Sequence, residues 1–157
     1  MKAAVLTVSD SCARGERTDE SGALLHQRLD ESGWQVVESK VVPDEIEAIR
    51  SVLIAWADKL HVDVVVTTGG TGLSPRDLTP EATLGIIERR AAGIMEALRA
   101  DGFRRTPRAC LSRGEAGVRG QTLFINLPGS RRAVSEGMDF LLPLLPHALE
   151  MMRGGGH

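Results

Sequence analysis

The stretch from residue 64 to residue 82 constrains this chain most, because it runs directly from an apolar strand into a glycine turn and then into a helix start. Val64, Val65 and Val66 form a β-branched run, typical of a parallel strand that is covered on both faces. The turn that follows permits positive φ and lets a ligand approach the main chain, through Gly69, Gly70 and Gly72. Nearby hydroxyl groups belong to Thr68, Thr71 and Ser74. The pattern predicts an anion site, and phosphate is the ligand that it favours.

The second half of this stretch adds charged groups to the glycine turn. Arg76 is a delocalised cation, and Asp77 is a carboxylate that could hold a metal ion. Thr79 is the expected cap of a helix that begins at Pro80, which would place Asp77 just ahead of a positive helix end. The glycines follow neither the dinucleotide pattern GxGxxG nor the P-loop pattern GxxxxGK, and GGTG alone fits a plain tight turn equally well.

Length and charge limit the kinds of partner. A chain of 157 residues is long enough for one domain, which we expect over residues 1–153, with 154–157 as a disordered tail. Its 19 basic and 21 acidic side chains give a net charge of −2. They form no run of like charge, and aromatic side chains for stacking bases are few. We therefore expect a small-molecule ligand and no nucleic acid.

Cysteines and apolar runs indicate the compartment. Cys12 and Cys110 are isolated from other metal-binding or redox residues, so two thiols are favoured over a disulfide. The first apolar run, Ala3 to Val8, is too short for a signal core, and prolines break the late apolar stretch 141–146. We expect a cytoplasmic protein that does not enter a membrane.

Strand-like and helix-like patterns alternate along the chain. Strands are expected at 2–8, 34–42, 62–68 and 121–127, with a short one at 109–112 and a loop at 113–120. Helices are expected at 20–32, 44–60, 80–90, 91–104 and 130–152, the last bent at Pro143 and Pro146. Right-handed crossovers between such units give an α/β fold: a three-layer α/β/α sandwich around a mostly parallel central sheet.

Polar loops follow four of the expected strands. They contain Ser9, Asp10 and Ser11 after the first strand, Pro43 and Asp44 after the second, the glycine turn after the third, and Asn126 to Ser130 after the last. Because the carboxyl ends of parallel strands share one edge, these loops should meet in one crevice. Plainer roles stay open: Asp10 and Ser11 as turn formers, Asp44 and Ser130 as helix caps, and Arg76 as a surface partner of Glu81.

Asp44 and Asp77 are the expected catalytic and metal-binding residues. Two carboxylates that face a phosphate-binding loop repel each other and the phosphates unless a divalent cation lies between them. Mg²⁺ favours one or two carboxylates together with phosphate oxygens and water. The pair therefore implies Mg²⁺ as the cofactor.

Four linked segments carry a family resemblance. They read VSDSCARGERTDESG from residue 8, VVPDEI from residue 41, TTGGTGLSPRDLTP from residue 67, and LSRGEAGVRGQTLFINLPGS from residue 111. Together they resemble the molybdenum-cofactor biosynthesis family, namely the molybdopterin adenylyltransferases of the Mog and MoaB type. The resemblance extends over nearly the whole chain.

The resemblance implies the molybdopterin-binding domain fold and Mg²⁺-dependent transfer of AMP from ATP to the terminal phosphate of molybdopterin, with release of pyrophosphate. Asp44 and Asp77 match the two essential aspartates of that family. The loops would bind nucleotide and pterin through Ser9, Asp10, Ser11, Thr68, Gly69, Gly70, Thr71, Gly72, Ser74, Arg76, Asn126, Pro128, Gly129 and Ser130. Arg113 and Arg119 are candidates for further phosphate contacts, or else solvated loop residues.

The same resemblance implies a homo-trimer or hexamer and a downstream molybdate-inserting enzyme as partner. The apolar side of the last helix could serve either as core or as interface, through Phe140, Leu141, Leu144, Leu145 and Leu149. The alternative to an enzyme is a non-catalytic paralogue that binds molybdopterin or nucleotide without turnover.

Overall fold

The computed structural model describes residues 1–155; of the expected tail at 154–157, residues 156 and 157 lie outside the described part. A six-stranded sheet has the strand order β2-β1-β3-β6-β5-β4. Its strands are β1 Lys2–Val8, β2 Gln35–Val42, β3 Val64–Thr68, β4 Arg89–Arg90, β5 Ala116–Arg119 and β6 Thr122–Leu127. The first four strands in this order are parallel, whereas β5 runs antiparallel to both β6 and β4.

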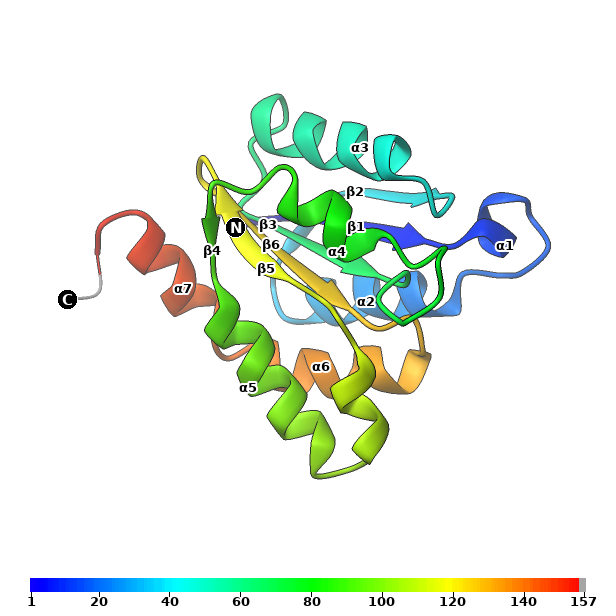
Figure 1. Cartoon of the computed structure of the whole chain (residues 1–157). Coiled ribbons are helices and arrows are strands. Elements are labelled where there is room, and N and C mark those ends of the chain that lie inside the picture. The colour runs from blue at the N-terminus through cyan, green and yellow to red at the C-terminus, as the bar shows by residue number, and fades with distance from the viewer. Residues whose placement is uncertain (156–157) are drawn as a thin grey trace.

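Helices cover both faces of the sheet (Figure 1). They are α1 Asp10–Ala13, α2 Glu20–Glu31, α3 Ile46–Asp58, α4 Thr79–Leu84, α5 Ala92–Phe103, the 3₁₀ helix η1 Pro107–Leu111, α6 Arg131–Leu141 and α7 Leu145–Met152. One face packs against α3 and α4, and the other against α2, α5, α6 and α7. The three-layer sandwich with a mostly parallel sheet, expected from the sequence, is confirmed.

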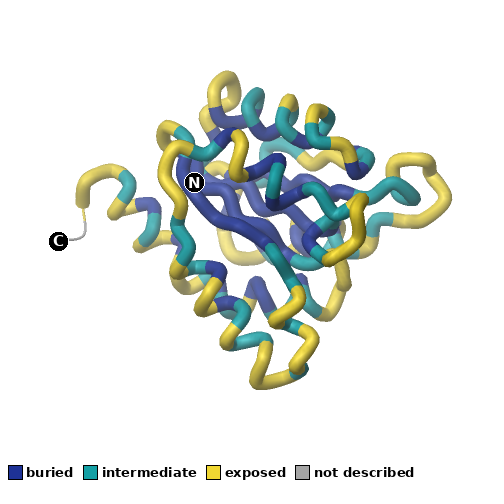
Figure 2. The backbone as a smooth tube through the Cα atoms, in the orientation of Figure 1, coloured by how far each residue is buried: buried dark blue, intermediate teal, exposed yellow. Residues whose placement is uncertain are grey.

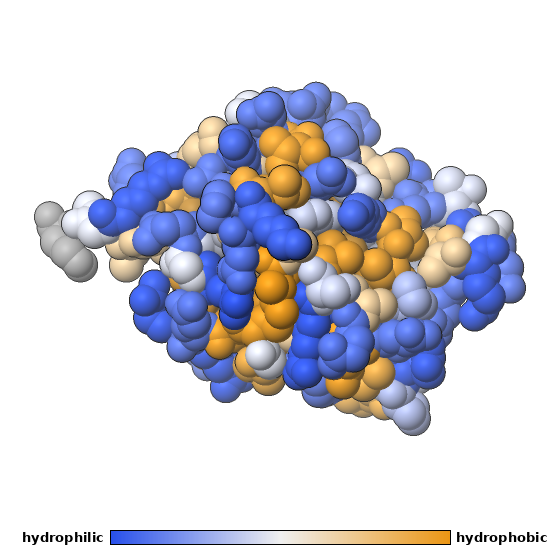
Figure 3. All heavy atoms as spheres, turned by 90° about the horizontal axis from the view of Figure 1, so that it is seen from above, coloured by the Kyte–Doolittle hydropathy of each residue, from blue (hydrophilic) through white to orange (hydrophobic). Residues whose placement is uncertain are grey.

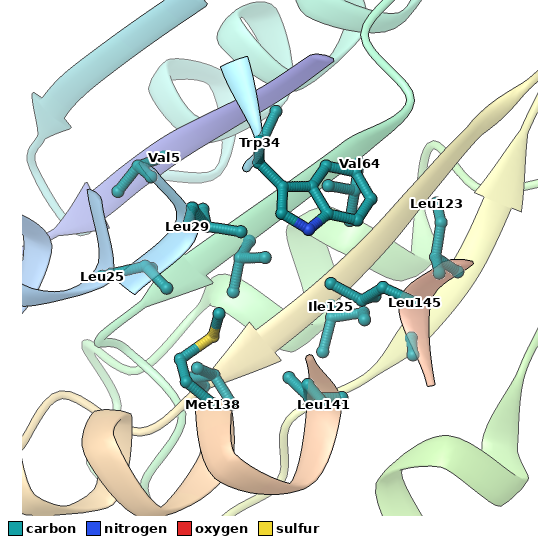
Figure 4. Packing of buried hydrophobic residues seen from close by; sticks show 14 of the residues in the cluster. Val5, Leu25, Leu29, Trp34, Val64, Leu123, Ile125, Met138, Leu141 and Leu145 are labelled. Atoms are coloured by element: carbon teal, nitrogen blue, oxygen red, sulfur yellow. The ribbon is translucent and has the colours of Figure 1, made fainter. Parts of the chain in front are cut away.

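The central strands are buried on both faces, as Figure 2 shows. In β3 the side chains of Val64 and Val66 enter one core cluster, and that of Val65 enters the other. This alternation follows from the two-residue period of a strand, and it explains why the run is apolar throughout. Figure 4 shows the larger cluster, in which Trp34 and Ile125 lie among leucines of the covering helices.

The region between α4 and β6 differs from the sequence expectation. The helix expected at 80–90 ends at Leu84, because the chain turns at Gly85 and Arg89–Arg90 pair with β5. Residues 109–111 of the strand expected at 109–112 belong to η1, which Pro107 starts and the Thr106 side chain caps, and Ser112 follows as its C-cap. The loop expected at 113–120 contains β5, which pairs with β6. These segments depend on partners distant in the sequence, so local patterns did not reveal them.

The last helix is interrupted rather than merely bent. It ends at Leu141, and α7 begins at Leu145, with Pro146 in its first turn, where a missing N–H is tolerated. Leu141, Leu145 and Leu149 lie in the core, whereas Leu144 is 45% exposed. The apolar side of this segment is therefore mostly core of the single chain.

Cys12 and Cys110 are free thiols, as expected. Within residues 1–155, the helices are too short or too polar to cross a membrane. On the face that carries α3, hydrophilic residues cover most of the surface and hydrophobic residues form patches among them (Figure 3).

Gly117 lies in β5, where the antiparallel part of the sheet is tightly packed. A Cβ at this position would lie 2.4 Å from Ile87 Cδ1 and 2.7 Å from the Arg89 carbonyl oxygen. Gly117→Ala should therefore lower the free energy of unfolding by about 1–3 kcal/mol, measured by urea denaturation. Gly93→Ala is the control, because a Cβ there meets nothing within 4 Å and the change should not destabilise α5. Equal stability of the two variants would contradict this packing.

Candidate active site

The loops after β1, β2, β3 and β6 meet at one edge of the sheet. The Ser9 amide donates to the Val42 carbonyl at 3.0 Å, which joins the first two loops. The Gly69 amide donates to the Leu127 carbonyl at 3.1 Å, which joins the other two. The Thr68 hydroxyl also donates to the Pro128 carbonyl, at 2.8 Å. The structure thus gathers the polar loops in the crevice that the sequence predicts.

The turn after β3 depends on two glycines in the left-handed region. Gly69 has φ 95° and Gly70 has φ 65°. A Cβ on Gly69 would lie 2.2 Å from the Val8 carbonyl oxygen, and one on Gly70 would lie 2.3 Å from Thr79 Oγ1. No side chain fits at either position, so the main chain itself lines the crevice.

Thr79 has a different role from the cap expected for it. It is the first residue of α4, and Leu78 occupies the N-cap position without a side-chain hydrogen bond. The Thr79 hydroxyl donates to the Gly69 carbonyl at 2.9 Å, and its amide donates to the Gly70 carbonyl at 3.1 Å. These two hydrogen bonds tie the first residue of α4 to the carbonyl groups of the glycine turn.

Asp10 and Asp44 hold each other through reciprocal hydrogen bonds. The Asp10 amide donates to Asp44 Oδ2 at 2.9 Å, and the Asp44 amide donates to Asp10 Oδ1 at 3.0 Å. Asp44 is buried, and its Oδ1 lies 3.0 Å from the position of a Cβ on Gly70. Burial raises the pKa of Asp44, the hydrogen bond from Asp10 lowers it, and the charges of Asp10 and Asp77 raise it further. Asp44 is not the cap of α3, since Glu45 occupies that position.

Arg76 pairs with Asp10 and not with Glu81, the surface partner considered for it. Its Nε donates to Asp10 Oδ2 at 3.1 Å, and its Nη2 donates to Asp10 Oδ1 at 2.8 Å. The hydrogen bonds from Arg76 hold the pKa of Asp10 below its ordinary value. Asp10 therefore has protein donors on both oxygens, and it links the cation to Asp44.

Asp77 approaches the same glycine turn at Gly72. Its Oδ2 accepts a hydrogen bond from the Ser74 amide at 2.8 Å and lies 2.8 Å from the position of a Cβ on Gly72. Asp44 and Asp77 thus approach Gly70 and Gly72, two residues apart on the same loop. Within residues 1–155, no cluster of three or more His, Cys, Asp or Glu side chains is placed to hold a metal ion. The two aspartates fit Mg²⁺, which takes one or two carboxylates and completes its shell with phosphate oxygens and water.

Other predicted site residues have structural partners. Ser130 caps α6 by accepting a hydrogen bond from the Ala133 amide, as expected, and Ser9 likewise accepts from the Cys12 amide. The Ser11 hydroxyl lies 3.2 Å from that of Ser9. The Gly129 carbonyl accepts a hydrogen bond from the Ser21 hydroxyl at 2.7 Å.

Asn126 lies beneath the crevice rather than in it. It is fully buried, and its Oδ1 accepts a hydrogen bond from the Glu115 amide at 3.0 Å. Its Nδ2 donates to the hydroxyls of Thr67 and Thr83, each at 3.0 Å. Both amide hydrogens are used inside the protein, which gives Asn126 a supporting place under the loops.

The two candidate arginines lie at opposite ends of β5. Arg113 contacts the glycine loop, donating to the Gly72 carbonyl at 2.8 Å. Arg119 pairs with Asp58 and the Ile86 carbonyl at the opposite edge of the sheet, so it does not belong to this site.

A pocket of about 580 Å³ opens from the glycine loop toward α5, η1 and α6. Gly70, Gly72 and Asp77 line one end, and Met95 and Leu98 contribute apolar surface on α5. Arg108 also lines it, and among residues 1–155 its guanidinium has no hydrogen-bond partner. Sequence reasoning missed this half of the site, because it searched only the ends of strands and these residues lie on helices.

Comparisons with known proteins place the chain among relatives. Residues 4–147 match the family described as probable molybdopterin binding domain. Molybdenum cofactor synthesis protein cinnamon of Drosophila melanogaster is 41% identical over 94% of this chain, which spans only 25% of that protein. Molybdopterin adenylyltransferase of Helicobacter pylori J99 is 36% identical over 96% of this chain and 86% of that protein. The crystal structure of the molybdopterin biosynthesis enzyme MoaB from Thermus thermophilus has a TM-score of 0.92 and 46% identity, covering 98% of this chain and 96% of that one.

Asn126→Ala should destabilise the fold by about 2–4 kcal/mol, because it leaves the Glu115 amide and two buried threonine hydroxyls without their partner. Urea denaturation measures the change. Gln121→Ala, at an exposed position before the same strand, is the control and should stay within about 0.5 kcal/mol. Unchanged stability of Asn126→Ala would remove its supporting role.

Proposed function

This chain belongs to the family of molybdopterin-binding domains, and from that premise we propose that it is a molybdopterin adenylyltransferase of molybdenum cofactor biosynthesis. It would transfer AMP from ATP to the terminal phosphate of molybdopterin and release pyrophosphate. The observation that carries the proposal is the approach of Asp44 and Asp77 to Gly70 and Gly72 of one loop. The name of the Helicobacter pylori relative, which this chain matches over most of both lengths, supports the same reaction.

The reaction forms a bond between a terminal phosphate oxygen of molybdopterin and the α-phosphorus of ATP, and it breaks the bond from that phosphorus to the bridging oxygen of the β-phosphate. Such a transfer needs in-line placement and neutralised charge more than covalent help from the protein. When Mg²⁺ is bound, Asp44 and Asp77 would hold it, and it would neutralise phosphate charge.

Main-chain donors supply the rest of the anion site. Within residues 1–155, the amides of Gly70, Thr71 and Gly72 donate no hydrogen bond, so they are available to phosphate oxygens. Arg76, which pairs with Asp10 at the exposed edge of the crevice, adds a positive charge near the phosphates. No side-chain nucleophile is required.

We propose that the pocket beside the glycine loop binds the ring system of one of the two substrates. It begins at the glycine loop, so a molecule filling it can place a phosphate against the free amides. Apolar side chains of α5 suit a flat ring system, and Arg108 offers an unpaired cation for polar groups. We propose that this substrate is molybdopterin, with the triphosphate of ATP at the rim.

The oligomeric state, the compartment and the partner enzyme are proposed from the family. We propose a homo-trimer or hexamer, to be measured by light scattering, that works in the cytoplasm and passes its product to a molybdate-inserting enzyme. The alternative of a binding paralogue predicts the same ligand affinities without release of pyrophosphate.

Asp77→Ala should lower the rate of pyrophosphate release by about 10² or more, the scale of losing a key electrostatic group. The assay contains purified protein, ATP, Mg²⁺ and molybdopterin. Glu47→Ala is the control, since Glu47 is an exposed carboxylate three residues after Asp44. A rate of Asp77→Ala equal to that of the control would end the catalytic assignment. Ligand binding without any pyrophosphate from the unmodified protein would favour the paralogue.

Arg108→Ala should raise KM for molybdopterin roughly three- to tenfold and leave KM for ATP unchanged, because it removes a charged donor from the pocket alone. Arg104→Ala is the matched control, since this exposed cation does not line the pocket. Steady-state kinetics with each substrate varied in turn measure both constants. A rise in KM for ATP instead would mean that ATP occupies the pocket and molybdopterin binds outside it.

A further inference from the structure

Arg113 reaches across the crevice and holds the glycine loop at several points. Its Nε donates to the Gly72 carbonyl at 2.8 Å, and its Nη2 donates to the Asp77 carbonyl at 2.7 Å. Its Nη1 donates to the carboxylate of Glu81 on α4. Its own amide donates to the Thr71 carbonyl at 2.8 Å. One residue thus contacts the loop at three places and the helix that follows it.

These contacts close the loop between Gly72 and Asp77. Inside this segment the tip is exposed, and the main internal ties are the two hydrogen bonds that join Ser74 and Asp77. The guanidinium bridges the two carbonyls that bound the segment, and its planar fork fixes their separation and direction. A lysine ammonium at this position would keep the charge but could not hold both carbonyls in that geometry.

The same contacts argue against a direct role in binding phosphate. The nitrogens of Arg113 donate to carbonyl and carboxylate oxygens of the protein. The negative charge that faces the guanidinium is Glu81, so substrate is not needed to neutralise it. This disagrees with the expectation of a phosphate contact from Arg113.

We propose that Arg113 is a positioning residue for adenylyl transfer: it sets the place of Asp77 and of the free amides at Gly70 to Gly72 without touching either substrate. The inference rests on the proposed function for its effect on rate. Its effect on the loop itself can be measured without any reaction.

Arg119, the last residue of β5, provides a matched control for Arg113, which precedes that strand. It donates to both carboxylate oxygens of Asp58, at 3.0 and 2.7 Å, and to the Ile86 carbonyl at 3.1 Å. Replacing either arginine by alanine removes an ion pair to a carboxylate and at least one hydrogen bond to a carbonyl. The contacts of Arg113 hold the glycine loop, and those of Arg119 lie at the far edge of the sheet.

The experiment compares the full chain with Arg113→Ala, Arg113→Lys and Arg119→Ala. Amide hydrogen exchange over residues 70–78 is measured without ligand, ATP affinity with Mg²⁺ by calorimetry, and kcat and KM by pyrophosphate release. We expect Arg113→Ala to exchange about tenfold faster in this segment, to bind ATP with Mg²⁺ about tenfold more weakly, and to lose kcat. Arg113→Lys should share the faster exchange, and Arg119→Ala should match the unmodified protein in all three.

Clear results would overturn the inference. Equal exchange over 70–78 in Arg113→Ala and Arg119→Ala would reduce Arg113 to an ordinary stabilising contact. Full function and slow exchange in Arg113→Lys would show that charge alone matters; this variant also serves if the alanine variant does not fold. If the unmodified protein releases no pyrophosphate, the proposed function fails, while the exchange measurement still decides whether Arg113 holds the loop.

Discussion

The site depends first on the absence of side chains at Gly69 and Gly70. With φ of 95° and 65°, these residues turn the chain sharply after β3, and a Cβ on either would lie within 2.3 Å of a neighbouring oxygen. That close approach lets the turn lie between the end of β1 and the start of α4. Because Gly70 carries no side chain, Asp44 can approach the loop, with its Oδ1 3.0 Å from the position that a Cβ on Gly70 would occupy.

The three aspartates near the glycine loop differ in how their negative charges are compensated. Asp10 is paired with Arg76, and this keeps its pKa low. Asp44 is buried beside Asp10, receives a main-chain hydrogen bond rather than a cation, and its pKa is raised, first of all by burial. Asp77 likewise accepts from a main-chain amide. A polyphosphate would add more negative charge to the same place, so a divalent cation is the simplest way to make the crevice attractive to it.

The sequence predicted the parts of this protein that are set locally. The run at Val64 to Val66 identified the central strand, and the alternation of elements placed the polar loops at one edge. It did not predict β5, whose four residues form a strand by pairing with β6 on one side and β4 on the other. The burial of Asn126 under the crevice was equally hidden, since its place at the end of a strand and the family resemblance both suggested a ligand contact. Side chains whose partners lie dozens of residues away, such as Arg76 and Arg113, could be named but not paired.

The antiparallel strand is what brings Arg113 to the site. In an all-parallel sheet, the residues before a strand lie at the edge opposite to the crevice. Because β5 runs against β6, with Ala116 beside Ile125, its first residues lie at the carboxyl edge, and Arg119 lies at the other. The same reversal places the pocket-lining segments α5 and η1, which precede β5, beside the glycine loop. The reversed direction of β5 therefore places both Arg113 and the pocket-lining segments α5 and η1 beside the glycine loop.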